Sequence, residues 1–220
     1  RAEDLFGNRN YDVFKEISPC DIRQGGLGDC YLLCAISSLA EQPSLITRLF
    51  ETKTINDFGV LGVWLNLNGI WTLYALDEYF PVDARGSLAF SKSVGNELWV
   101  IILEKAYAKA YGSYIDIVGG DPSHALRDLT GAPIDRIEDY SDLSTAWAKL
   151  KDANSKNYIL TCFTKQGATV EAQSDDGLVA GHAYSILDVR EIFDSRGKPR
   201  LIVQIRNPWG NFEWNGCYGE

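Results

Sequence analysis

Residues 24–33 of this 220-residue chain read QGGLGDCYLL, a glycine-rich turn that leads a cysteine into an apolar segment. Apolar residues then recur at helical spacing until Pro43. Asp29 is a residue type that commonly caps helix N-termini. The stretch therefore predicts a helix that runs from Cys30 to about Gln42.

Cys30 would lie in the first turn of this helix, where unpaired backbone N–H groups and the helix dipole favour an anion such as a thiolate. The glycines before it leave room for a second backbone, such as that of a peptide substrate. These features predict a nucleophile. The alternative is a cysteine that only fills apolar space, which is the interpretation we favour for Cys34 and Cys162.

The composition is that of a packed protein, with 45% hydrophobic and 23% charged residues. Its length suits one large domain or two small lobes that share an interface. A net charge of −9 argues against nucleic acid or an anionic membrane as the main partner, and it is compatible with cation binding. Every apolar run is shorter than the ~20 residues of a membrane span, so we expect no stable membrane insertion.

The five cysteines show neither the paired spacing of a disulfide scaffold nor a zinc pattern. We therefore expect free thiols in a reducing compartment and a cytoplasmic location. The chain begins at Arg1 without a methionine and stops abruptly at Glu220. We expect it to be part of a longer protein that carries further domains.

Hydrophobic periodicity and turn signals predict the remaining elements. Asn68-Gly69 predicts a tight hairpin, Asn96 and Gly112 bracket a helix, and Ser141 is a candidate cap for a later helix. The expected helices are 97–111, 123–129 and 142–150; the expected strands are 60–67, 70–76, 158–163, 182–193 and 200–205; residues 166–181 are expected to form a loop.

Helices dominate the first half and strands the second, so we predict an α+β fold with two lobes. Residues 118–122 (VGGDP) contain glycines and a proline that interrupt regular structure, and we expect the boundary between the lobes there. Residues 1–120 would form a helical lobe that carries Cys30. Residues 121–220 would form a β-rich lobe, incomplete at its C-terminal end, that carries His182 and Asn207, with the active site in the cleft between the lobes.

A cysteine nucleophile requires a base, and the base requires a third group that fixes its tautomer and orientation. Cys30, His182 and Asn207 supply these types in order. His182 follows Cys30 by 152 residues and precedes Asn207 by 25, close to the separations in papain-like proteases. Gln24 could direct its amide at an oxyanion, with the Cys30 backbone N–H as the second donor. His124 lacks such a context and is interpreted as a helix-surface residue.

Taken singly, these residues have simpler explanations. A histidine at a strand start is more often structural, an asparagine before proline is usually a turn residue, and Gln24 before two glycines reads as loop. Their joint order favours the catalytic interpretation.

Longer segments support it and occur in one family's order over nearly the whole chain. These are 21–33 (DIRQGGLGDCYLL), 95–99 (GNELW), 103–109 (LEKAYAK), 112–114 (GSY), 119–120 (GG), 181–185 (GHAYS), 206–210 (RNPWG) and 213–214 (EW). With them the chain resembles the protease core of the calpains, papain-like, calcium-activated cysteine proteases of the cytosol.

The resemblance implies an intracellular calpain-type cysteine endopeptidase that acts on protein or peptide substrates. It implies that Cys30 attacks the scissile amide, His182 serves as base and then acid, Asn207 orients His182, and Gln24 stabilises the oxyanion. It also implies that Gly120 and Gly181 bind the substrate backbone and that Trp209 shields the His–Asn pair. Tyr31 replaces the family's usual tryptophan after the nucleophile.

The resemblance further implies calcium as a cofactor, with one ion in each lobe. Asp21 and Glu97 match the carboxylate ligands of the first site, which backbone carbonyls near Phe14 and Glu16 would complete. Glu213 matches a ligand of the second site, where Glu220 stands in place of an aspartate. Carboxylate and carbonyl oxygens are the ligands that calcium requires.

Two other functions remain open from the sequence. A calpain-like protein without activity could serve as a regulatory or scaffolding module, although the Cys, His, Asn and Gln set is intact. A Cys–His acyltransferase such as a transglutaminase would use an aspartate where this chain has Asn207.

Overall fold

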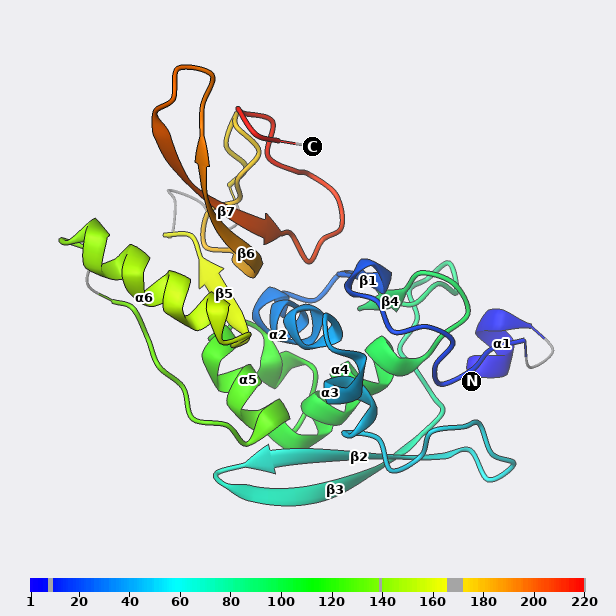
Figure 1. Cartoon of the computed structure of the whole chain (residues 1–220). Coiled ribbons are helices and arrows are strands. Elements are labelled where there is room, and N and C mark those ends of the chain that lie inside the picture. The colour runs from blue at the N-terminus through cyan, green and yellow to red at the C-terminus, as the bar shows by residue number, and fades with distance from the viewer. Residues whose placement is uncertain (8–9, 139, 166–171, 220) are drawn as a thin grey trace.

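The computed structural model describes residues 1–7, 10–138, 140–165 and 172–219. Its helices and strands combine into a mixed α/β architecture (Figure 1). In chain order the elements are α1 (Ala2–Phe6), a 3₁₀ turn (Pro19–Asp21), β1 (Ile22–Arg23), α2 (Cys30–Ala40), α3 (Pro43–Thr47), β2 (Val60–Leu67), β3 (Ile70–Asp77), β4 (Lys92–Ser93), α4 (Trp99–Tyr111), a second 3₁₀ turn (Ile115–Ile117), α5 (Pro122–Thr130), α6 (Leu143–Ser155), β5 (Leu160–Phe163), β6 (Ala183–Phe193) and β7 (Pro199–Arg206).

Helix α2 lies at the centre of the molecule. Every residue from Tyr31 to Ala40 is buried, so the helix has neighbours on all sides. Helices α3, α4 and α5 pack on one side of it, and the sheet of β5, β6 and β7 lies across the other (Figure 1). The predicted helix is confirmed, and it ends at Ala40, two residues earlier than expected.

The β2–β3 hairpin covers the outer side of the helices and matches its prediction closely. Its strands pair from Val60 opposite Asp77 to Leu67 opposite Ile70. Asn68 and Gly69 both have positive φ angles, 53° and 82°, as a two-residue hairpin turn of this type requires.

The second half contributes a three-stranded antiparallel sheet in the order β5-β6-β7. The register of β6 against β7 shifts between Ile186 and Asp188, which leaves Leu187 as a bulge. Helix α6 lies beside β6, where Asn154 Nδ2 donates to Asp188 Oδ1 at 3.1 Å. The far end of the β6–β7 hairpin projects away from the helices (Figure 1).

The predicted start of the helix after Asn96 is wrong. Helix α4 begins at Trp99, because the residues before it make other contacts. The Asn96 carbonyl accepts from Asp12 N–H, and Leu98 N–H donates to the Asp12 carbonyl. Gly112, with φ 120°, ends the helix as expected.

Other element ends also differ from the prediction. Asp142, not Ser141, caps α6 and accepts from the N–H groups of Ser144 and Thr145. This helix runs to Ser155 and delays the following strand to Leu160. Helix α5 gains one residue at each end, and its Asp121 side chain caps Ser123 N–H.

The first strand residue of β6 is Ala183 and not His182, and β7 extends by one residue at each end to Pro199 and Arg206. The expected loop at 166–181 lies partly outside the described residues.

Helix α5, which the expected boundary after Gly120 assigns to the second lobe, packs against α2 and β2. Its residues Ala125 and Leu129 are fully buried in the core of the helical half. The division into two lobes stays a prediction. The segment before Pro19 also contributes to the core, since Ala2, Tyr11 and Val13 are buried.

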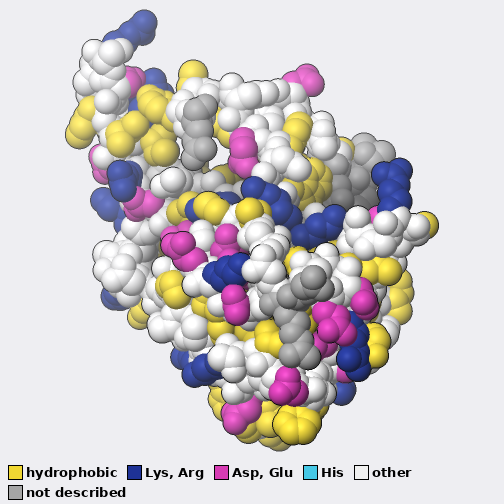
Figure 2. All heavy atoms as spheres, turned by 90° about the vertical axis from the view of Figure 1, so that its right-hand side faces the viewer, with side chains coloured by type: hydrophobic (Ala, Val, Ile, Leu, Met, Phe, Trp, Pro, Cys, Tyr) yellow, Lys and Arg dark blue, Asp and Glu magenta, His cyan; other side chains and the backbone are white. Residues whose placement is uncertain are grey.

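The surface face in Figure 2 mixes acidic, basic and apolar side chains. Within the part of the chain that the structure describes, no helix is both long enough and apolar enough to cross a membrane.

Candidate active site

The loop before α2 is held against the segment at residues 89–91. Gly26 N–H donates to the Ala89 carbonyl at 2.9 Å. A Cβ atom on Gly25 would lie 1.9 Å from the Phe90 carbonyl oxygen, so this close approach requires glycine. Gln24 Nε2 donates to the Leu27 carbonyl at 2.7 Å, which turns its amide into the loop and uses one of its two hydrogens.

Cys30 is the first residue of α2 and is only partly buried. The other two cysteines near the core differ from it. Cys34 is fully buried, and burial raises the pKa of its thiol. Burial also raises the pKa of Cys162 to about 11. Since the thiolate is the nucleophile, the raised pKa values argue against Cys34 and Cys162 in that role.

His182 is fully buried and lies just before β6. Hydrogen bonds between its backbone and Thr164 hold it in place. Its N–H donates to Thr164 Oγ1, and its carbonyl accepts from Thr164 N–H, both at 3.0 Å. The imidazole centroid lies 4.7 Å from the Trp209 ring and 5.1 Å from the Tyr184 ring. These contacts enclose the ring on two sides.

Asn207 follows the last residue of β7 and is 1% exposed. Its Nδ2 donates to the carbonyls of Asn211 and Phe212, at 3.1 and 3.0 Å. Its Oδ1 accepts from Trp209 N–H at 3.0 Å and lies 2.9 Å from His182 Nε2. Because both amide hydrogens face carbonyls, the oxygen must face the imidazole, and Nε2 of the neutral ring must carry the proton.

Several contacts join the α2 region to the β6–β7 region. Ser185 Oγ donates to the Cys34 carbonyl at 3.1 Å, one helical turn beyond Cys30. Burial raises the pKa of Tyr184, and Cys162, Glu213 and Cys30 make smaller contributions, so Tyr184 lies within electrostatic range of Cys30.

The turn after Asn207 also meets the loop that leads to Cys30. A Cβ on Gly210 would clash with the Arg23 guanidinium, so Arg23 lies directly on this turn. A cavity of about 310 Å³ lies between the two segments. Its walls are Gln24, Gly25, Gly26, Leu27, Gly28, Trp209 and Asn211.

The glycines expected to bind substrate lie at different edges of this region. Gly119 N–H donates to the Gly28 carbonyl at 2.8 Å, which ties the 119–120 segment to the turn before Cys30. A Cβ on Gly120 would lie 2.5 Å from Cζ of Tyr31, so the glycine is packed on that ring. Gly181 has φ 64° and donates its N–H to the Lys165 carbonyl.

Asp21 and Glu97 lie close enough to interact. Burial raises the pKa of Glu97, and the charge of Asp21 raises it further. Burial likewise raises the pKa of Asp21. Glu97 Oε2 accepts from the N–H groups of Lys15 and Glu16, at 2.9 and 3.3 Å, so the 15–16 segment wraps around this carboxylate. Two neighbouring, partly desolvated carboxylates fit a hard cation.

The second expected metal site has less support. The backbone of Glu213 packs against Gly177, and its charge acts on Tyr184. Glu220 lies outside the described residues. Within the ranges that the structure covers, no three or more His, Cys, Asp or Glu residues group as a metal site.

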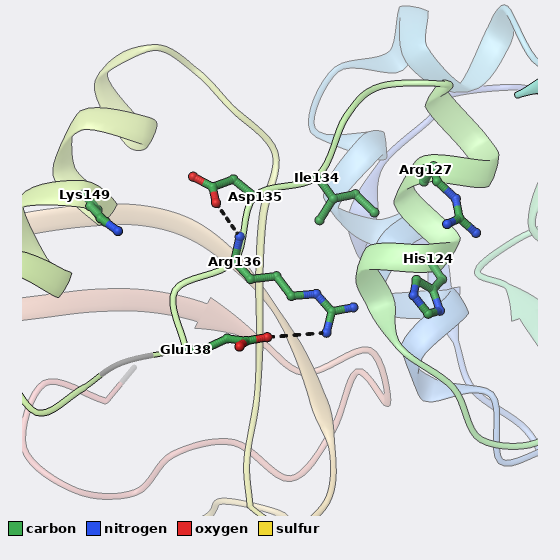
Figure 3. A pocket seen from close by; sticks show the side chains of 7 residues that line it. All are labelled: His124, Arg127, Ile134, Asp135, Arg136, Glu138 and Lys149. Carbon is green, nitrogen blue, oxygen red and sulfur yellow. Dashed lines mark hydrogen bonds and ion pairs between the residues drawn. The ribbon is translucent and has the colours of Figure 1, made fainter. Parts of the chain in front are cut away.

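A cavity of about 600 Å³ lies away from these residues, between α5 and α6. His124, exposed as expected, lines it together with Arg127, Arg136 and Lys149 (Figure 3). Arg127 pairs with Asp128, and Arg136 pairs with Asp121 at 2.7 Å, so both guanidinium charges are already compensated.

Sequence reasoning missed several residues of the site. Thr164 anchors the His182 backbone, and Tyr184 packs on its ring. Asp29 does not cap α2 with its side chain; it is fully buried against Glu104. Tyr184 could have been predicted to lie beside His182, because side chains two residues apart in a strand point to the same face. The partner of Asp29 could not, because Glu104 lies 75 residues further along the chain.

The calpain family cysteine protease model matches residues 1–220. The chain is 38% identical to the calpain-type cysteine protease DEK1 of Zea mays over 96% of its length, and this match covers 10% of the maize protein. It is 36% identical to Calpain-8 of Mus musculus, over 91% of this chain and 29% of the mouse protein.

It is also 33% identical to Calpain-14 of Homo sapiens, over the whole chain and 32% of the human protein. The chain thus spans between a tenth and a third of the length of these relatives. The match to the family model over the full chain, together with these identities, decides the assignment: the chain belongs to the calpain family of cysteine proteases.

Proposed function

We propose that this chain is a cysteine endopeptidase core that hydrolyses peptide bonds through Cys30, His182 and Asn207. The observation that carries the proposal is the hydrogen-bonded position of Asn207, which holds His182 in one tautomer beside Trp209. Across the adjacent cavity lies the loop that ends at Cys30. Family membership supports the same chemistry.

In this mechanism His182 Nδ1 takes the proton of the Cys30 thiol, and the sulfur forms a bond with the scissile carbonyl carbon. The negative oxygen would receive hydrogen bonds from the Cys30 backbone N–H and from the remaining amide hydrogen of Gln24. His182 then gives the proton to the leaving nitrogen as the C–N bond breaks. A water molecule, deprotonated by His182, hydrolyses the thioester and restores the thiol.

Asn207 contributes by fixing the imidazole. It accepts from Nε2–H, which keeps Nδ1 basic and stabilises the imidazolium after it gains a proton. Trp209 covers this hydrogen bond with its ring and keeps water from competing for it. Gly120 and Gly181 would bind the substrate backbone at the edges of the cleft.

We also propose that Asp21 and Glu97 hold a calcium ion, with Glu213 belonging to a second site. The ion would supply positive charge that draws the 15–16 segment, the turn at Asp21 and the start of α4 together. Protein or peptide substrates, a cytoplasmic location and further domains in the parent protein are part of this proposal.

Cleavage of an unstructured protein and of a fluorogenic peptide, with and without calcium, tests the function. We expect Cys30→Ala to lower the rate by at least about 1,000-fold, since the nucleophile is removed. Cys20→Ala, which removes an exposed thiol ten residues before the nucleophile, serves as the matched control and should keep the activity. Activity that survives in Cys30→Ala rejects the proposal.

A further inference from the structure

Two carboxyl groups meet in the core directly behind Cys30. Asp29 is fully buried, and Glu104, from the middle of α4, is 2% exposed. No donor in the described ranges forms a hydrogen bond with either carboxyl oxygen of Asp29, and the side chain that interacts with this carboxyl is Glu104. Asp29 thus occupies the N-cap position of α2, but its side chain makes no capping hydrogen bond.

The surroundings of the pair hold no compensating cation among the described residues. The groups that act on Asp29 and Glu104 are each other and Ser91, whose N–H donates to Glu104 Oε1 at 3.0 Å. The titratable neighbours that interact electrostatically with the pair are Tyr31 and Tyr114. Burial raises the pKa of both phenols. Two buried carboxylates without a cation cannot both ionise, and a hydrogen bond between them requires a shared proton.

Glu104 also touches both ends of the loop that presents the nucleophile. Through Ser91 it holds the 89–91 segment, on which Gly25 and Gly26 rest. Through Asp29 it holds the residue that immediately precedes Cys30. One side chain, fixed within a buried helix, therefore ties the loop at two points.

We propose that Asp29 and Glu104 form a proton-sharing carboxyl pair that positions the loop from Gln24 to Cys30 for catalysis. Both are positioning residues that act through the loop. The existence of the Asp29–Glu104 pair does not depend on the proposed function, whereas its effect on peptide hydrolysis rests on that function.

Burial raises the pKa of both carboxyls, and the neighbouring Glu104 raises that of Asp29 further, well above its ordinary value, whereas Ser91 N–H favours the ionised form of Glu104. The proton therefore resides on Asp29, which donates to the Glu104 carboxylate. In the unfolded chain Asp29 would ionise near pH 4. Because the folded protein keeps this proton to higher pH, the contribution of the pair to stability is greatest below about pH 4 and falls as pH rises towards the folded pKa of Asp29.

The first test follows unfolding temperature against pH in the whole protein. Asp29→Asn cannot ionise, and its amide can still donate to Glu104. We expect its unfolding temperature to rise relative to the unsubstituted protein as pH increases from 4 to 8. Asp142→Asn is the matched control, because the Asp142 carboxylate accepts from Ser144 and Thr145 and its pKa is lowered.

The control should show the opposite sign at lower pH, with the variant losing stability relative to the unsubstituted protein as pH rises to about 4 and little further change from there to pH 8. The same loss of stability in Asp29→Asn would mean that Asp29 is an ionised cap, and it would overturn the pair. This measurement involves no catalysis, so it separates failure of the pair from failure of the proposed function.

The second test addresses positioning. Asp29→Ala removes the link to Glu104, and we expect kcat to fall about 10- to 100-fold with KM changed far less. Asp29→Asn should recover most of that loss. The alkylation rate of Cys30, followed on its own peptide by mass spectrometry, should fall and recover in parallel. Equal kcat and equal Cys30 alkylation in a folded Asp29→Ala variant and the unsubstituted protein would overturn the positioning role.

If Asp29→Ala does not fold, Glu104→Gln provides the decisive comparison. It keeps an acceptor for Ser91 N–H but lets Asp29 ionise beside Cys30. We expect its pH–rate profile to differ from that of the unsubstituted protein, and a superimposable profile would contradict the proposal.

Discussion

Oδ1 of Asn207 lies 2.9 Å from Nε2 of His182, and the same amide donates to two backbone carbonyls in the turn that follows β7. The turn therefore decides which way the amide faces, and the amide decides which imidazole nitrogen carries the proton. A neutral turn residue thereby fixes the tautomer of a buried histidine.

The first prediction concerns this hydrogen bond. Asn207→Ala should lower kcat by about 10- to 100-fold, because the imidazole loses its fixed tautomer and orientation, and KM should change little. Steady-state kinetics on a fluorogenic peptide provide the measurement. A large rise in KM with unchanged kcat would instead assign Asn207 to substrate binding.

The second prediction concerns the thiols. Burial raises the pKa of Cys162 to about 11 and also raises that of Cys34. At pH 8 a small alkylating agent should therefore modify Cys30 before Cys34 and Cys162, and labelling of Cys162 should accelerate only as pH approaches about 11. Peptide mapping by mass spectrometry across this range checks the order, and faster labelling of Cys162 than of Cys30 at pH 8 would contradict it.

The third prediction concerns the scaffold between α4 and α5. Asp128 is fully buried and accepts from the hydroxyls of Tyr107 and Tyr111, at 3.1 and 2.5 Å. Asp128→Ala would leave both hydroxyls without this acceptor and should destabilise the protein by about 2–4 kcal/mol.

Calorimetry should show a melting temperature lowered by roughly 5–15 °C. The control is Asp152→Ala, which removes an exposed pair with Lys156 and should leave the melting temperature nearly unchanged. Equal effects of the two substitutions would show that the Asp128 cluster does not stabilise the scaffold.

The fourth prediction concerns calcium. If Asp21 and Glu97 hold the ion, calcium at about 100 times its dissociation constant should add about 2.7 kcal/mol of stability. The melting temperature should then rise by roughly 5–10 °C, and chelation should reverse the rise. Glu97→Gln should reduce the shift, whereas Glu138→Gln, on the 131–140 connection, should keep it. A shift of equal size in Glu97→Gln would contradict the assignment.

Local signals were enough for elements whose ends depend on their own residues. Asn68 and Gly69 define the β2–β3 turn, and both strands follow from it. The helix after Asn96 was misplaced because Asp12, 84 residues earlier, binds the backbone that would have formed its first turn. Periodicity carries no information on such a partner.

In the candidate site, too, some features could be predicted from the sequence and others could not. Cys30, His182 and Asn207 could be predicted as candidates from the sequence, because their joint order and spacing point to one chemistry although each residue alone has a simpler explanation. The burial of Asp29 against Glu104 could not, since a cap and a buried acid look alike in sequence. Tertiary packing replaced the local hydrogen bond that Asp29 would otherwise make.

The most direct test is covalent labelling with a peptidyl epoxide in the presence of calcium, followed by mapping of the modified residue in the unsubstituted protein and in His182→Ala. The account predicts one equivalent of label on Cys30, formed at least about 100-fold more slowly when the imidazole is absent. Label on a different cysteine, or equal rates at Cys30 in the two proteins, would contradict it.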